Sequence, residues 1–340
     1  MKVVFMGTPD FAQESLRAIY EAGFDILAVV TNPDKPKGRG MKMIASPVKE
    51  YALEKGIKVY QPPKIRNNVE FIDTLKSLEP DVLCVVAYGK ILPQEVLDIP
   101  KYGAINVHGS LLPKYRGAAP IQWAVLNGEK ETGITTMFMD AGMDTGDMIL
   151  KEKVSIREEE TTGELWERLS KLGAQLLVQT LEKIQNVAHE INNANSNIQE
   201  QIKLKVGAEK QGDEYTMAPM LDKEMAKIDW NKSAEEIHNL IRGLNPIMGA
   251  YTYENGKKIK IWKSKIANIE TDNDSKNGEV IISDKKEGLF VKTSKGVLQL
   301  LEVQGENGKR MDIKSFLNGN QIEKGIIDKI YIENKLFAVF

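Results

Sequence analysis

Three polar side chains in the middle of the chain could carry out chemistry together. Asn106 and His108 are two residues apart in Ala104–His108, whose apolar residues predict a strand. Alternate residues of a strand share one face, which places an amide and an imidazole side by side near the strand's end. Asp144 lies in the glycine-rich segment Ala141–Asp147, which predicts a loop that can return a carboxylate over the sheet. Satisfied polar groups at a strand end and a turn-forming aspartate remain the alternatives.

The elements that must position these side chains alternate between strand and helix. Apolar runs predict strands at Lys2–Met6, Asp25–Thr31, Lys58–Tyr60, Asp81–Ala87 and Ala104–His108. Helical periodicity occurs in Phe11–Ala22, Pro47–Lys55, Val69–Ser77 and Pro120–Asn127. This order is typical of an α/β fold with a Rossmann-like, doubly wound, mostly parallel sheet. A β pair and a long helix are expected to complete the domain, at Ile134–Asp140, Met148–Ile156 and Thr162–Ala188.

Such a sheet binds ligands beyond the carboxyl ends of its strands, where Asn106 and His108 are expected. The first strand leads into Gly7-Thr8-Pro9-Asp10, which holds one glycine and no G-x-G-x-x-G pattern. A nicotinamide dinucleotide is therefore not expected.

The second part of the chain has a different pattern. Asn192–Gln201 is rich in Asn, Ser and Gln, which indicates a linker, and a helix is expected at Ala234–Gly243. Short alternating strands follow at Ala250–Tyr253, Lys258–Ser264, Gly278–Ser283, Leu289–Lys292, Val297–Val303 and Lys335–Val339. They favour a small OB-like β-barrel, a type that often binds oligonucleotides. We expect a catalytic domain at 1–189, a linker at 190–205 and a β-barrel domain at 206–340.

Composition limits the class of protein. A chain of 340 residues fits two domains, and no apolar run has the roughly 20 residues of a membrane span. The N-terminus does not resemble a signal peptide, so we expect a cytoplasmic protein. The single cysteine, Cys84, lies in an apolar run and is interpreted as a buried strand thiol. The net charge of −2 argues against a protein that coats nucleic acid, so any RNA contact must be local.

Two basic segments could make such a local contact. Asn32–Lys49 is too long for a βα connection, which usually takes about 2–6 residues, and it is rich in Lys and Arg. A disordered basic loop is the alternative. Lys257–Lys265 alternates charged with apolar residues, so it predicts a half-buried strand with a basic face. A solvated edge strand protected by lysines would have the same pattern.

Several motifs resemble a known family. Asn106–Pro120 (NVHGSLLPKYRGAAP) and Ala141–Asp147 (AGMDTGD) closely resemble the signature of enzymes that use 10-formyltetrahydrofolate. Matches to the methionyl-tRNA formyltransferase family extend to FMGTPDF at residues 5–11, TNPDKPKGRG at 31–40, SPVK at 46–49 and APML at 218–221. Asn245–Tyr251 departs from the family pattern, in which a second proline commonly precedes the glycine.

The resemblance implies a one-carbon transferase of protein biosynthesis. It would transfer the formyl group of 10-formyltetrahydrofolate to the amino group of initiator methionyl-tRNA, and no metal is expected. Separately, a monomer is expected because the sequence has no obvious apolar surface stripe. By motif position the family's catalytic set falls on Asn106, His108 and Asp144. The folate-binding residues are expected to be Ser110, Leu111, Leu112, Pro113, Tyr88 and Gly89.

The resemblance also implies where tRNA would bind. The insertion of the family enters the acceptor stem, and Arg39 matches the arginine that acts there. The expected tRNA-binding residues are Arg39, Lys35, Lys37, Lys42, Lys258, Lys260 and Lys263.

Three other functions remain open. A related enzyme would formylate another amine, such as an amino-sugar nucleotide or glycinamide ribonucleotide, but would not need the basic insertion. A formyltetrahydrofolate hydrolase would deliver the group to water and is expected to carry a regulatory domain before the sheet. A non-enzymatic RNA-binding module would tolerate replacement of Asn106, His108 and Asp144.

Overall fold

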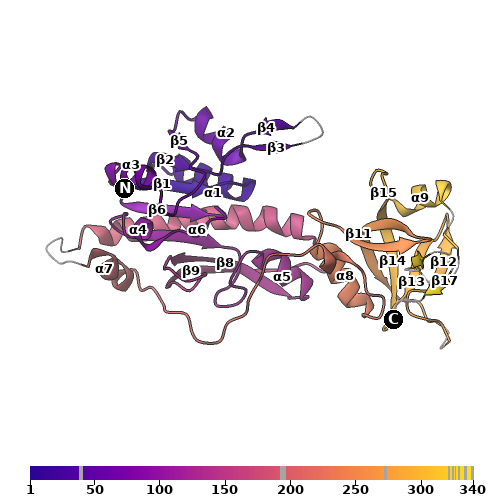
Figure 1. The fold of residues 1–340 in the computed structure, drawn as a ribbon. Coiled ribbons are helices and arrows are strands. Elements are labelled where there is room, and N and C mark those ends of the chain that lie inside the picture. The colour runs from indigo at the N-terminus through magenta and orange to yellow at the C-terminus, as the bar shows by residue number, and fades with distance from the viewer. Residues whose placement is uncertain are drawn as a thin grey trace. The chain divides into compact units, whose positions relative to one another are not determined.

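The computed structural model comprises two units (Figure 1). It describes residues 1–37, 41–191, 197–271, 274–320, 322–323, 325, 327, 330–332 and 335–337. Unit 1 contains Met1–Pro120, Glu131–Val154 and Trp166–Pro219, and unit 2 contains Ile121–Lys130, Ser155–Leu165 and Met220–Phe340. The two units therefore interleave along the chain, so two short segments before residue 189 pack with unit 2.

Unit 1 is built on a seven-stranded sheet with the order β5-β2-β1-β6-β7-β8-β9. The strands are β1 (Lys2–Gly7), β2 (Asp25–Val30), β5 (Val59–Tyr60), β6 (Val82–Val86), β7 (Ala104–His108), β8 (Glu131–Phe138) and β9 (Met148–Ser155). The strands from β5 to β7 pair in parallel, and β8 runs antiparallel to β7. The expected mostly parallel sheet is confirmed.

Helices cover both faces of this sheet. They are α1 (Asp10–Glu21), α2 (Pro47–Glu54), α3 (Val69–Ser77), α4 (Gln94–Leu97) and α6 (Thr162–Ala188). Helix α5 (Pro120–Leu126) belongs to unit 2 after its first residue. On one face, α3 and α4 bury a cluster with residues of β1 and β6, including Met6 and Leu83. On the other face, the rings of Phe11 in α1 and Trp166 in α6 pack edge-on with 5.0 Å between their centroids, and Gly173 of α6 lies against Val107 of β7. Helices on both faces are typical of a doubly wound fold.

The long basic insertion contains a hairpin that the sequence analysis did not predict. Strands β3 (Lys35–Lys37) and β4 (Lys42–Ile44) pair antiparallel, and in Figure 1 they extend away from the body of unit 1. Residues 38–40, and with them Arg39, lie outside the described residues.

The expected linker differs from the structure in its described part. Helix α7 (Ile198–Lys205) begins at Asn197, whose side chain caps the helix by accepting from the Glu200 N–H. Ile202 is fully buried, and Gln199 donates to the carbonyl of Pro100 at 2.9 Å. Polar composition predicted a linker here, but one N-cap, one buried apolar side chain and the Gln199 hydrogen bond hold a short helix on unit 1. Residues 192–196 lie outside the described residues.

Unit 2 is a β domain with helices α8 (Ala234–Gly243) and α9 (Ile313–Gly319) and the 3-10 turn η1 (Glu224–Ala226). Its sheet runs β10-β11-β14-β13-β12, with β15 beside β14 and a separate β16–β17 pair. The bounds are β10 (Ala250–Glu254), β11 (Lys257–Ala267), β12 (Val280–Asp284), β13 (Gly288–Lys292), β14 (Val297–Gly305), β15 (Met311–Asp312), β16 (Ile330–Ile332) and β17 (Lys335–Phe337). Over the described strands this path does not close into a barrel. None of the described helices combines the length and apolar character that crossing a membrane requires.

Candidate active site

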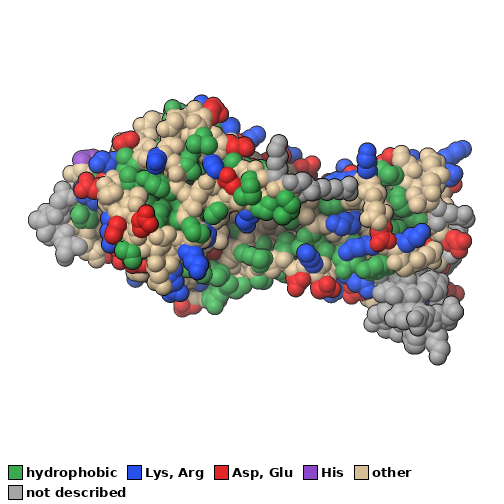
Figure 2. All heavy atoms as spheres, turned by 45° about the horizontal axis from the view of Figure 1, so that its top comes forward, with side chains coloured by type: hydrophobic (Ala, Val, Ile, Leu, Met, Phe, Trp, Pro, Cys, Tyr) green, Lys and Arg blue, Asp and Glu red, His purple; other side chains and the backbone are tan. Residues whose placement is uncertain are grey.

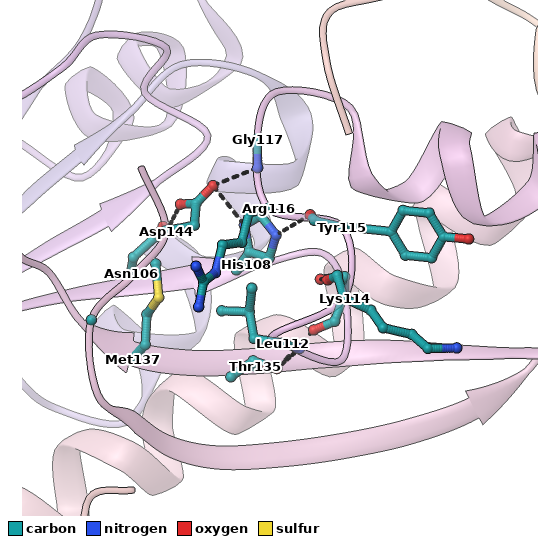
Figure 3. Close-up of polar contacts among 12 residues, drawn as sticks. Asn106, His108, Leu112, Lys114, Tyr115, Arg116, Gly117, Thr135, Met137 and Asp144 are labelled. Atoms are coloured by element: carbon teal, nitrogen blue, oxygen red, sulfur yellow. Dashed lines mark hydrogen bonds and ion pairs between the residues drawn. The ribbon is translucent and has the colours of Figure 1, made fainter. Parts of the chain in front are cut away.

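Strand β7 presents Asn106 and His108 at the carboxyl edge of the sheet (Figure 3). Asn106 is held between Val85 of β6 and Met137 of β8, and His108 pairs with Thr135. His108 is 5% exposed and Asn106 is half-buried. The hydrogen-bonded neighbours on both sides keep the strand rigid, so the two side chains are aimed by backbone that cannot easily move.

Asp144 comes from the loop between β8 and β9 and turns back toward these two side chains, as Figure 3 shows. Its Oδ2 lies 3.7 Å from Nδ1 of His108, and its Oδ1 accepts from Nδ2 of Asn106 across a long 3.4 Å. The backbone N–H of Gly117 donates to Oδ2 at 2.8 Å. Asp144 has a φ of 55°, in the left-handed region that Asp tolerates better than most residues. The structure thus brings the three predicted catalytic residues together.

The second ring nitrogen of His108 is also engaged. Nε2 lies 2.9 Å from the carbonyl oxygen of Tyr115, which can only accept, so Nε2 carries a proton. Tyr115 itself has a φ of 61°. This contact leaves Nδ1 as the nitrogen that faces Asp144. The Tyr115 carbonyl and the Asp144 carboxylate therefore fix the orientation of the imidazole together.

The Ser110–Pro113 loop is held by Thr135 of β8. The Thr135 hydroxyl donates to the carbonyl of Ser110 at 2.7 Å and accepts from the N–H of Leu112 at 3.1 Å. The Ser110 hydroxyl donates to the carbonyl of Lys114 at 2.6 Å. Leu112 is 1% exposed and packs with the core, while Leu111 and Pro113 are half-buried. The side chains of Ser110 and Leu112 are therefore used by the fold, and the backbone of the loop is what a ligand could meet.

Tyr88 and Gly89, the other expected folate contacts, differ from each other in exposure. Tyr88 is 2% exposed and lies in the core cluster, where burial raises the pKa of its hydroxyl to about 12. Gly89 is exposed and has a φ of 77°. A ligand at this edge would therefore meet the backbone around Gly89 rather than the Tyr88 ring.

The base of the insertion is tied to three strand ends. Asn32, directly after β2, donates from Nδ2 to the Thr8 hydroxyl at 3.0 Å and to the Tyr88 carbonyl at 2.8 Å. Asp34 forms an ion pair with Lys49 at 2.7 Å and accepts from Gln61 at 2.8 Å. Both contacts, the one with Lys49 foremost, lower the pKa of Asp34. The insertion therefore leaves the sheet from a well-anchored base.

The expected tRNA-binding residues divide into two groups. In the insertion, Lys35 is exposed, whereas Arg39 and the side chains of Lys37 and Lys42 lie outside what the structure describes. In β11, Lys258 packs over the ring of Tyr251 at 3.4 Å, Lys260 donates to the carbonyl of Met248 at 2.8 Å, and Lys263 is exposed.

Other chemistry has less support in the described residues. Among the residues that the structure describes, no three His, Cys, Asp or Glu side chains lie close enough together to hold a metal ion. Cys84 is fully buried in β6, and burial raises the pKa of its thiol, so the reactive thiolate is disfavoured.

Three residues that hold the site were not predicted from the sequence: Tyr115, Gly117 and Thr135. Their contributions come through a carbonyl, an amide N–H and a buried hydroxyl, which side-chain chemistry does not reveal. The only signal in the sequence was that residue 117 is a glycine. Its φ of 122° favours glycine, and a Cβ at this position would lie 2.7 Å from the carbonyl oxygen of Ala218.

Comparisons with known proteins place both parts of the chain. Residues 1–181 match the formyl transferase family, and residues 220–321 match the formyl transferase C-terminal domain. An N-formyltransferase from Helicobacter canadensis, solved with folinic acid and dTDP-3-aminofucose, has a TM-score of 0.62 at 22% identity. That match covers 90% of this chain and 100% of the solved chain, and at this identity it supports the fold alone.

Two relatives are similar over nearly the whole length. The methionyl-tRNA formyltransferase of Caldanaerobacter subterraneus subsp. tengcongensis is 50% identical over 330 residues, which is 97% of this chain and 100% of the relative. That of Clostridioides difficile is 49% identical over 329 residues, which is 96% of this chain and 99% of the relative. The family expected from the motifs is thereby confirmed: this chain belongs to the methionyl-tRNA formyltransferase family.

Proposed function

We propose that this enzyme transfers the formyl group of 10-formyltetrahydrofolate to the amino group of methionine on initiator tRNA. The observation that carries the proposal is the grouping of Asn106, His108 and Asp144 at the carboxyl ends of the sheet's strands. It occurs in a chain about half identical, over nearly its full length, to enzymes named for this reaction. The product would be N-formylmethionyl-tRNA, which serves translation initiation.

The reaction begins when the amine attacks the formyl carbon, which builds a tetrahedral oxyanion. The Asn106 amide has two N–H donors, and the long 3.4 Å contact with Asp144 engages one of them weakly. The other can donate to the oxyanion. Removing a donor of this kind typically costs about 2.7–4 kcal/mol of transition-state stabilisation. Because Nε2 of His108 already donates to Tyr115, Asn106 is the stronger candidate for this role.

The His108–Asp144 pair handles the proton. The attacking amine must lose one proton, and the folate nitrogen that leaves must gain one, so the two transfers balance. Asp144 faces Nδ1 and stabilises the imidazolium that forms when Nδ1 takes the proton. No covalent enzyme intermediate is required.

Folate would bind where Ser110–Pro113 and the chain around Gly89 border the catalytic group. The buried Thr135 hydroxyl keeps the loop backbone in place, so its amide and carbonyl groups are preorganised for a flat pterin. In this proposal the expected folate-binding residues act through backbone contacts and through the shape of the pocket rather than through side-chain hydrogen bonds: Ser110, Leu111, Leu112, Pro113, Tyr88 and Gly89.

The tRNA would contact two local basic segments rather than a broad basic surface. Figure 2 shows acidic and basic side chains intermixed on the face of unit 1 in view, so no broad basic surface of that face would attract RNA. The basic insertion with Arg39 and the β11 lysines would supply the phosphate contacts instead. The same proposal includes the OB-like character of unit 2, a monomeric state and a cytoplasmic location.

One assay tests the acceptor and the donor together. The enzyme is incubated with 10-formyltetrahydrofolate and, in separate reactions, with initiator methionyl-tRNA, uncharged tRNA, an amino-sugar nucleotide or no acceptor. Formylmethionine on tRNA alone supports the proposal. Formylation of the sugar nucleotide alone would overturn the acceptor, and equal release of formate without any acceptor would favour a hydrolase.

A further inference from the structure

Gln211 joins the two loops that surround Asp144. It lies outside both family matches, in the segment between residues 181 and 220, and its side chain is partly buried. Its Nε2 donates to the carbonyl of Asp144 at 2.8 Å and to the carbonyl of Gly146 at 2.9 Å. Its Oε1 accepts from Nε of Arg116 at 2.8 Å. One amide therefore uses both N–H donors on the Asp144 loop and its oxygen on the facing loop.

The facing loop is the one that holds the other side of the catalytic group. Arg116 lies between Tyr115, whose carbonyl accepts from His108, and Gly117, whose N–H donates to Asp144. The segment that carries Gln211 also pairs directly with this loop. The Arg116 N–H donates to the carbonyl of Thr216 at 2.8 Å, and the Arg116 carbonyl accepts from Ala218 at 2.7 Å.

Asp144 needs such support because its left-handed backbone is a sparsely populated conformation. Residues held there cost of order 1–3 kcal/mol and persist when their surroundings over-determine them. The two Gln211 bonds fall on the carbonyls of Asp144 and Gly146, one on the strained residue and one two residues after it.

We propose that Gln211 is a positioning residue, which holds Asp144 against His108 by clamping the 140–147 loop to the Tyr115–Gly117 loop. Its hydrogen bonds reach the backbone of the Asp144 loop and Arg116, and none reaches Asn106, His108 or the Asp144 carboxylate, so its loss acts through the position of Asp144. The inference rests on the proposed formyl transfer for its kinetic consequence, but the clamp itself is a property of the free enzyme.

The clamp needs an amide at residue 211, because one end of the side chain must donate hydrogen bonds and the other must accept one. In Gln211→Glu one oxygen can still accept from Arg116, but the other would face two carbonyl oxygens in place of an N–H donor. Gln211→Met keeps the length of the side chain and removes its hydrogen bonds to Asp144, Gly146 and Arg116. Both variants should release the 140–147 loop. If they do, the hydrogen bonds of the amide hold the loop, and the volume of the side chain alone does not.

Gln199 offers a matched control. It lies in the same segment between the family matches, and its Nε2 also donates to two carbonyls of unit 1, those of Leu97 and Pro100. Gln199→Met therefore removes a similar clamp that does not involve the Asp144 loop.

The experiment compares the full-length wild type with the three variants by steady-state kinetics and by hydrogen exchange of the 140–147 peptide. We expect kcat of Gln211→Met and Gln211→Glu to fall about 100-fold, as for a misplacement of roughly 1 Å, with KM for both substrates within threefold. Exchange of the peptide should rise at least about tenfold, as the loop opens more often. Gln199→Met should match the wild type in kcat and in this exchange.

Each departure has a distinct meaning. If Gln211→Met exchanges faster but keeps the wild-type kcat, or loses kcat without faster exchange, the positioning role is overturned. An equal loss in Gln199→Met also overturns it, because the effect is then general. A wild type that forms no formylmethionine overturns the proposed function instead, and the exchange comparison still decides whether Gln211 holds the loop.

Discussion

Nδ1 of His108 lies 3.7 Å from Oδ2 of Asp144, although 36 positions separate the two residues along the chain. One side chain comes from the interior of the sheet and the other from a loop with a left-handed backbone. The distance exceeds that of a direct hydrogen bond, so a small loop movement on substrate binding can tighten it.

Asp144→Asn should lower kcat by about 100-fold or more, because a neutral amide cannot stabilise the imidazolium that accepts the proton. The measurement is the formylation rate of initiator methionyl-tRNA at saturating substrates. Asp140→Asn is the control, since the Asp140 carboxylate accepts from Gly142 and Thr145 in the same loop and an amide oxygen can do the same. Equal rates for both variants would contradict the role of Asp144.

Gly146→Ala should disrupt the catalytic loop for a steric reason. A Cβ at this position would lie 1.7 Å from the carbonyl oxygen of Phe138, so the backbone must shift. We expect a loss of about 1–3 kcal/mol in the free energy of unfolding, or more, together with lower activity. Urea unfolding measures the first. Gly212→Ala is the control, because no atom lies within 4 Å of a Cβ there; equal stability of the two variants would refute the steric account.

Thr135→Val should weaken the binding of folate more than it impairs the binding of tRNA. The substitution keeps the shape but leaves the Ser110 carbonyl and the Leu112 N–H without their partner, at a cost of about 1–3 kcal/mol for each buried group. KM for 10-formyltetrahydrofolate should rise, as steady-state kinetics would measure. Thr136→Val is the matched control on the next residue of β8, since Thr136 contacts Thr180 on the other side of the sheet. An unchanged folate KM in Thr135→Val would show that the loop does not need this hydroxyl.

The stability of unit 2 should depend on pH through His238. This side chain is 7% exposed, and burial lowers its pKa below the ordinary value of 6.5 despite the nearby Glu159 carboxylate, which raises it. The unfolded chain then binds a proton at a pH at which the folded chain does not, so stability is full above about pH 6.5 and declines as the pH falls toward the folded pKa.

The measurement is the urea midpoint of unit 2 between pH 8 and pH 5. His238→Gln, which can retain a hydrogen bond to Ser264, should have a weaker dependence over this range. A variant with the same pH profile as the wild type would assign the dependence to other groups.

Local pattern predicted a large part of this fold. The bounds expected for Ala104–His108, Val69–Ser77, Thr162–Ala188 and Ala234–Gly243 agree with the structure residue for residue. In the helices the 3.6-residue period places the apolar residues on one buried face, whereas the strand Ala104–His108 is a short apolar run that is buried on both faces. The expectation failed where few residues carry the signal. The β3–β4 hairpin, α7 and α9 were all missed, because each is short and depends on a partner or a cap rather than on periodicity.

By itself, the sequence determined that Asn106 and His108 share a face at the edge of a parallel sheet, since strand periodicity acts between neighbours two residues apart. The tertiary structure alone decided that Nε2 of His108 meets a carbonyl, that the Tyr88 ring is buried in the core, and that Gln211 bonds to Asp144 from 67 positions away. The physical reason is range: periodicity and capping act over a few residues. A contact between loops depends instead on where the chain returns after it has crossed the sheet.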